Sequence, residues 1–151
     1  MIKNIFDSSV SEELIQRINK LSAESKPLWG KMNVAQAMAH CCVTYEFVYT
    51  DKHPKPGKLK RFLLKTVVKQ GVVGEKAYNK NLRTAPEFIK VDEHEFEEER
   101  NRLISYIKRT QELGPEYFDG KESHSFGILN LKEWNNMFYK HLDHHLSQFG
   151  V

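Results

Sequence analysis

Three histidines fall within five positions near the end of the chain, in 140-KHLDHHLSQFG-150. On a helix, residues four apart lie about 40° from each other on one face, so His141 and His145 can direct their imidazoles toward one point. This is the spacing with which one helix holds a metal ion through two histidines. The apolar residues of the same segment, such as Trp134, lie on the side of His141 and His145, whereas His144 falls at the margin of that stripe. The spacing therefore predicts His141 and His145 as an inward-facing pair.

Two histidines make an incomplete metal site, because zinc and similar ions usually take at least three protein ligands. His40 is the only histidine inside another apolar helical segment, although it lies at the edge of the apolar stripe, beside Gln36 and Thr44. Three neutral imidazoles without a fourth side chain would leave coordination positions for water or substrate, which is typical of catalytic sites. There the ion would act as a Lewis acid or lower the pKa of a bound water or thiol.

Five further residues are candidates for the pocket or for hydrogen bonds to the ligands: His144, His124, Gln36, Thr44 and Gln148. His124 precedes the last helix and could approach the site, but its position in a loop favours the surface. Two alternatives to a metal site stay open. Histidines near a helix C-terminus can favour the negative end of the helix dipole when they are protonated, and the three histidines can be purely structural.

The elements that carry these residues are helical by their hydrophobic spacing. Asn33 predicts the start of the helix that contains His40, and this helix runs to the Pro/Gly-rich stretch 51-DKHPKPG-57. Capping boxes predict the starts of three other helices. A short amphipathic helix follows the Pro/Gly-rich stretch, with its apolar residues on one side and its lysines on the other. The capping boxes are Ser9 with Glu12, Asp92 with Glu95 and Asn130 with Glu133. Besides the helix that contains His40, the predicted helices cover about 10–23, 58–71, 92–113 and 130–149.

The stretch 75–91 has no clean period and is expected to be an irregular connection, like the loop 119–127. No strand pattern competes with the helices. We therefore predict an all-α fold over residues 1–151 as a single domain: a four-helix bundle with a long crossover, over about 51–91, that carries a short accessory helix.

Composition favours a soluble protein without a nucleic-acid partner. The chain has 151 residues, a formal net charge of +3 and interleaved acidic and basic residues. No window approaches the length of a membrane span, and the first residues lack a secretory signal, so we expect a cytoplasmic protein. Cys41 and Cys42 are adjacent and are expected to be buried and unpaired. The basic face of the short helix either is solvated or attracts an anionic partner.

Three stretches together resemble a branch of the DinB-like (YfiT-like) metalloenzyme superfamily that is labelled a domain of unknown function. They are 28-LWGKMNVAQAMAHCC-42, 84-TAPEFIKVDEHEFEEERNRLISYI-107 and 124-HSFGILNLKEWNNMFYKHLDHHLSQFGV-151. The resemblance implies a four-helix bundle with a long crossover between the second and third core helices. It also implies a divalent ion, often nickel or zinc, held by His40, His141 and His145. Some relatives transfer low-molecular-weight thiols, and the superfamily suggests a homodimer.

Two functional hypotheses follow. The first is a metal-dependent transferase or hydrolase that activates a thiol or water for a small-molecule substrate, as in thiol S-transferases. The second is a non-catalytic binding or stress-associated module in which the metal only holds the bundle together. The sequence identifies neither the substrate nor the metal, and it does not locate an interface between subunits.

Overall fold

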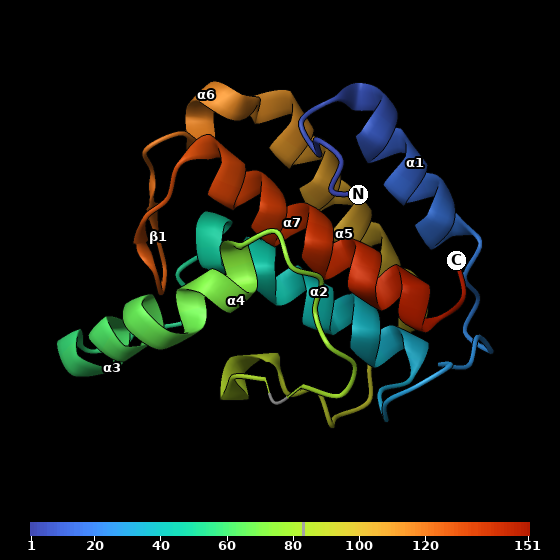
Figure 1. The fold of residues 1–151 in the computed structure, drawn as a ribbon. Helices are drawn as coiled ribbons and strands as arrows, with labels where there is room; N and C mark the ends of the chain where they lie inside the picture. The colour runs from blue at the N-terminus through green and yellow to red at the C-terminus, as the bar shows by residue number, and fades with distance from the viewer. Residues whose placement is uncertain (83) are drawn as a thin grey trace.

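A computed structural model describes residues 1–82 and 84–151 of the chain, and these residues are mostly helical. Four long helices make the body of the described part: α1 (Ser8–Asn19), α2 (Val34–Tyr49), α5 (Phe96–Leu113) and α7 (Leu131–Gln148) (Figure 1). Helix α5 packs against α1 and α2, and α7 packs against the same two helices from the other side. The predicted all-α bundle is confirmed.

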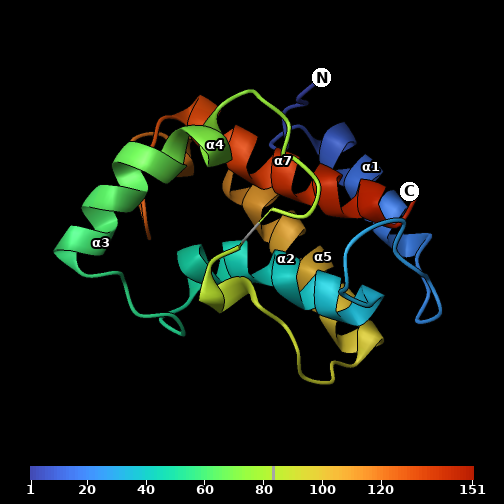
Figure 2. The same cartoon turned by 60° about the horizontal axis from the view of Figure 1, so that its bottom comes forward.

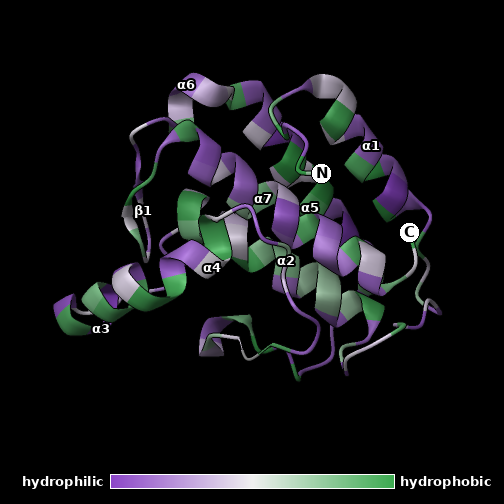
Figure 3. Cartoon of the chain, viewed as in Figure 1, coloured by the Kyte–Doolittle hydropathy of each residue, from purple (hydrophilic) through white to green (hydrophobic). Residues whose placement is uncertain are grey.

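Amphipathic spacing accounts for this packing, because each long helix turns an apolar stripe to the common core. Figure 3 shows hydrophilic and hydrophobic segments alternating along α1 and α7. Helix α2 differs, since most of its residues are buried, including both cysteines, which are unpaired. It is therefore the central helix of the described fold. The largest fully buried side chains are Trp134, Tyr45, Phe118, Phe138, Ile5, Leu14, Ile18, Met38, Leu103, Ile107, Leu129 and Leu142.

The two helices that carry the histidines begin at predicted caps. The Asn33 side chain accepts a hydrogen bond from the backbone N–H of Gln36, whose own side chain accepts from the backbone of Asn33. Asn130 and Glu133 form the same reciprocal pair at the start of α7. Each cap satisfies two backbone donors and fixes the residue at which its helix begins.

The capping boxes predicted for the other two long helices are wrong. Helix α1 begins at Ser8, before the predicted capping residue Ser9, and neither it nor α5 has a side-chain cap. The backbone between Asp92 and Glu95 is not helical, and α5 begins only at Phe96, whose ring is buried in the core. Burial of an aromatic ring outweighs a single capping bond in placing this helix start.

The crossover contains more helix than the sequence predicted. It runs as α3 (Lys58–Leu63), a π-helical segment η1 (Leu64–Val68) and α4 (Lys69–Val73), so Gly71 does not end it. Figure 2 shows α3 standing away from the four long helices. Its apolar residues Leu59, Phe62 and Leu63 are 76%, 63% and 52% exposed, so this part of its apolar side does not belong to the core. In the connection after Gly74, the described residues 75–82 and 84–91 are irregular, as predicted, except for the 3-10 turn η2 (Pro86–Phe88).

Three short elements between α5 and α7 were not predicted. They are α6 (Pro115–Phe118) and the strands β1 (Glu122–Ser123) and β2 (Gly127–Ile128), which pair antiparallel. Strands of two residues carry no readable alternation, and α6 is only one turn long. None of the helices in the described ranges is long and apolar enough to cross a membrane.

Candidate functional site

Helices α2 and α7 bring together the three histidines selected from the sequence. His40 lies in the middle of α2, and His141 and His145 lie one turn apart near the end of α7. Their ring centroids are 4.9 Å apart for His40 and His141, 4.4 Å for His40 and His145, and 4.9 Å for His141 and His145. One potential ligand atom from each residue lies within 4.8 Å of the other two. We call these three residues the histidine triad.

Hydrogen bonds fix the tautomers of two triad members. His40 Nδ1 lies 2.8 Å from the carbonyl oxygen of Phe88, and His145 Nδ1 lies 2.9 Å from Oε1 of Gln148. The Gln148 amide is itself oriented, because its Nε2 donates to the carbonyl oxygen of Trp29 at 2.7 Å. Both oxygens can only accept, so Nδ1 of each histidine carries the proton. The Nε2 atoms of His40 and His145 therefore carry no proton, and each can offer its lone pair to a cation.

His141 completes the donor set. Its Nε2 lies 3.0 Å from Nε2 of His40, and its Nδ1 lies 3.0 Å from the Thr44 hydroxyl oxygen. If His141 donates from Nδ1 to Thr44, two bare Nε2 lone pairs face each other and need a cation between them. In the other tautomer, His141 carries its proton on Nε2 and donates it to Nε2 of His40, and the Thr44 hydroxyl donates to His141 Nδ1. A set of three imidazoles whose outer nitrogens are held by oxygens suits a divalent metal ion.

Burial keeps the triad neutral at physiological pH. Removal from water lowers the pKa of His40 to about 4 and that of His145 to about 3, and it lowers the pKa of His141 well below 6.5. The positive charge of Lys90 adds to the effect on His40, and the neighbouring imidazoles add to the effect on His141. Neutral imidazole is the form that binds metal, so the triad need not lose protons to do so at pH 7.

The triad forms part of the wall of a large cavity, about 1040 Å³ in volume. The cavity lies between the α2–α7 pair and the crossover, and its wall is mostly apolar and aromatic. Ligand pockets in proteins usually measure about 300–1,000 Å³. The apolar and aromatic wall residues include Trp29, Met32, Phe47, Val48, Leu64, Val67, Val68, Val72, Tyr78, Leu82, Phe88, Ile89, Val91, Phe126, Trp134 and Met137.

The five residues expected around the ligands all line this cavity, but they have different contacts. Thr44 and Gln148 contact triad members directly, as described above. The His144 ring lies edge-on to that of His145, with centroids 5.0 Å apart, and outside the triad. Gln36 caps α2, and its Nε2 donates to the carbonyl oxygen of Asp92, so it does not reach the triad by a hydrogen bond.

The surface position favoured for His124 is wrong. This residue is buried and stacks on Phe47, with ring centroids 4.0 Å apart and planes within 3°. Its Nε2 lies 3.2 Å and 3.1 Å from the carbonyl oxygens of His53 and Pro54. Burial lowers the pKa of His124. These contacts come from segments about 70 residues away, so local spacing carried no signal for them.

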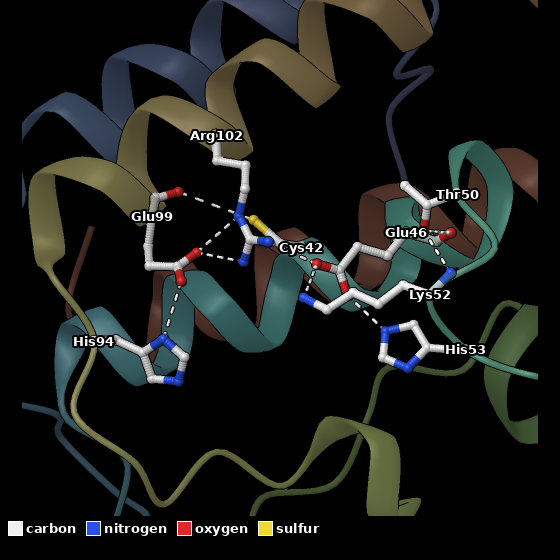
Figure 4. A network of polar contacts seen from close by, with 8 residues as sticks. All are labelled: Cys42, Glu46, Thr50, Lys52, His53, His94, Glu99 and Arg102. Atoms are coloured by element: carbon white, nitrogen blue, oxygen red, sulfur yellow. Dashed lines mark hydrogen bonds and ion pairs between the residues drawn. The ribbon is translucent and has the colours of Figure 1, made fainter.

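A second polar cluster lies between α2 and α5 (Figure 4). The carboxylate of Glu46 is buried and accepts from Arg102, Lys52 and His53 at 2.6–3.0 Å. Arg102 also pairs with Glu99, which pairs in turn with His94. The sequence reasoning missed this cluster, because Glu46 belongs to an otherwise apolar helix and its partners come from other segments. Its charges are paired within the cluster, and the Arg102–Glu46 pair links α5 to α2.

Comparison with known proteins identifies a family for the chain but no activity. Residues 6–150 match the protein family described as "Protein of unknown function (DUF1569)". Searches of curated proteins and of solved structures gave no significant match.

Proposed function

We propose that this chain, which belongs to the DUF1569 family of proteins of unknown function, binds a divalent metal ion through His40, His141 and His145 and uses it in catalysis. The observation that carries the proposal is the hydrogen bonding of the triad. Each Nδ1 has an oxygen partner, supplied by Phe88 or by the Thr44 or Gln148 side chain. This arrangement turns the Nε2 atoms toward one another and orients the rings as ligands.

The ion would supply Lewis acidity at an open coordination position, which lowers the pKa of a bound thiol or water. The chain supplies the rest. Thr44, Gln148 and the Phe88 carbonyl hold the imidazoles, and burial keeps them neutral. The apolar cavity holds a small-molecule substrate beside the triad and limits its contact with water.

The resemblance to DinB-like metalloenzymes supports the same proposal. The long crossover and the origin of the three histidines, one from the second helix and two from the last, agree with what that resemblance implies. We therefore propose nickel or zinc as the ion, because imidazole nitrogens suit both. The proposed reaction is transfer to or from a low-molecular-weight thiol, or hydrolysis, in a homodimer.

All three triad residues line the cavity, so a ligand held there could reach the ion. An ion that only holds helices together needs no such access, and this favours the enzyme over the metal-stabilised binding module. Cobalt substitution separates the two. We expect the absorption spectrum of the cobalt-loaded protein to change when small thiols are added. A spectrum that no thiol in the panel alters supports the non-catalytic module.

Elemental analysis of untagged protein tests the metal site directly. We expect about one divalent ion per chain, and loss of both the ion and the metal-induced rise in melting temperature in His141→Ala. His144→Ala is the matched control, because His144 lies on the same helix outside the triad, and it should keep the ion. Wild-type protein that binds no nickel, zinc or cobalt contradicts the proposal, as does equal metal loss in the two variants.

A further inference from the structure

The cavity beside the triad also identifies the class of substrate. We infer that it binds a molecule with a bulky apolar body and one anionic group, and that the anionic group lies at the end near the triad. The inference rests on the proposed function for the role of the triad, but the shape and chemistry of the cavity carry it. At about 1040 Å³ the cavity exceeds what water or a small thiol alone would occupy.

The crossover supplies an apolar wall that the protein itself does not cover. Leu64, Val67, Val68 and Val72 line the cavity, and Val67 and Val68 remain 75% and 40% exposed. The first three lie in the π-helical segment η1. π-Helical turns are rare and occur often at functional sites. Exposed apolar side chains that converge on one cavity favour a ligand that removes them from water.

The facing wall is aromatic and reaches the triad. Phe88 connects this wall to the triad. Its carbonyl oxygen accepts from His40, and its ring lies 5.1 Å from the His40 ring and 5.7 Å from that of His141. Trp29 and Trp134 also line the cavity. His40 and His145 are only 5% and 7% exposed, so only a slender group can reach them. These dimensions fit one end of a small molecule better than a folded partner.

Charge on the cavity wall favours an anionic group at that end. Among the described residues that line the cavity, Glu87 is the only acidic one, and it pairs with Lys60 at 3.5 Å. Lys31 and Lys90 line the cavity as well. Lys90 lies two residues after Phe88, whose carbonyl oxygen contacts His40 at 2.8 Å. An anion near the triad would therefore meet an excess of positive charge.

Binding of dodecanoate provides the test, because it joins a long alkyl chain to one carboxylate. Both tryptophans of the chain line the cavity, so their fluorescence reports binding. We expect dodecanoate to bind more tightly than uncharged dodecanol. Butanoate, which lacks eight methylene groups, should bind at least about a hundredfold more weakly than dodecanoate. Lys90→Ala should weaken dodecanoate by up to about fivefold and leave dodecanol unchanged.

Two aspartate variants locate the ligand. Val67→Asp places a charge on the cavity wall, and we expect it to weaken dodecanoate by about tenfold or more. Leu59→Asp is the matched control, because Leu59 lies in the same crossover and is 76% exposed but does not line the cavity. It should bind like the wild type. Both positions are exposed, so both variants should fold.

The metal content of the same samples separates this inference from the proposed function. Protein that binds metal but not dodecanoate overturns the inference and leaves the proposed metal site intact. Protein that binds dodecanoate with the expected dependence on Val67 but holds no metal contradicts the proposed function instead. Equal losses in Val67→Asp and Leu59→Asp place the ligand outside the cavity and overturn the inference. If dodecanol binds as tightly as dodecanoate, the inference that the ligand carries an anionic group is overturned.

Discussion

The three histidines are equivalent in type but not in surroundings. His40 and His145 each donate from Nδ1 to an oxygen that can only accept, so their Nε2 atoms are available in the structure as it stands. His141 instead faces the Thr44 hydroxyl, which can accept or donate. His141 is therefore the residue whose tautomer can change when a cation enters, and the other two are set in advance.

Gln148 is the outer partner whose role is most easily tested. Gln148→Leu removes the acceptor of His145 Nδ1 and the donor to the Trp29 carbonyl. We expect metal affinity to fall by about 10–100-fold, because groups that orient a ligating histidine usually have effects of this size. Competition with a chromophoric chelator measures the change. Gln16→Leu, at an exposed position on α1, should leave affinity unaltered.

The conservative variant Gln148→Glu separates orientation of His145 from general damage. A glutamate keeps an acceptor for His145 Nδ1 but replaces the donor to the Trp29 carbonyl with a second acceptor, so it should retain more of the affinity than Gln148→Leu. Affinity in Gln148→Leu that matches the wild type would show that His145 does not depend on this contact.

At the scale of elements, the sequence was informative where the signal is local. The i, i+4 spacing selected His141 and His145, and the caps at Asn33 and Asn130 placed the two helices that meet at the site. His40 followed from its position in an apolar helix. Burial of His124 against Phe47 could not be predicted, because it depends on packing between distant segments.

The crossover shows the same limit. Its apolar residues have helical spacing, which predicts a helix with one apolar side. In the structure Val67 and Val68 line the cavity, and Leu59 lies outside it. Periodicity reports that a helix has an apolar face but not what lies opposite that face. Part of the apolar side predicted for this helix thus forms a wall of the candidate binding site.

Lys140 anchors the crossover to the bundle. Its ammonium is buried against the end of α4 and donates to the carbonyl oxygens of Gly71, Val72 and Gly74, the last at 2.6 Å. Lys140→Met keeps much of the side-chain volume but leaves these acceptors without a donor. We expect a loss of about 1–3 kcal/mol in the free energy of unfolding, since unsatisfied buried groups cost about this much.

Hydrogen exchange should localise the effect. Amide protection should fall first in 69–74, which the lost bonds hold to α7. Lys132→Met is the control, because Lys132 lies on the same helix in an exposed ion pair with Glu75, and such pairs contribute little. A uniform loss of protection across all four long helices would contradict an anchoring role.

For the whole molecule, the triad makes stability depend on pH when no metal is bound. The pKa of an unfolded histidine is about 6.5, whereas burial lowers those of His40 and His145 to about 4 and about 3. Between these values the unfolded chain binds more protons than the native one, so stability falls as pH falls. The buried carboxylate of Glu46 does not contribute to this pH dependence above pH 5. Burial raises its pKa, but hydrogen bonds from His53 and Lys52 outweigh burial and hold the pKa below its usual 4.5.

Urea unfolding of metal-free protein between pH 7.5 and pH 5 measures this loss. We expect the free energy of unfolding to be nearly constant down to about pH 6.5 and then to fall by about 1.4 kcal/mol per pH unit for each triad histidine that stays neutral in the native state. His40→Asn removes one of these groups, so its curve should be less steep. Stability that stays constant or rises from pH 6.5 to pH 5 would contradict this prediction. It would mean that the native triad takes up protons as readily as the unfolded chain, which the burial of the imidazoles and the mutual approach of their Nε2 atoms oppose.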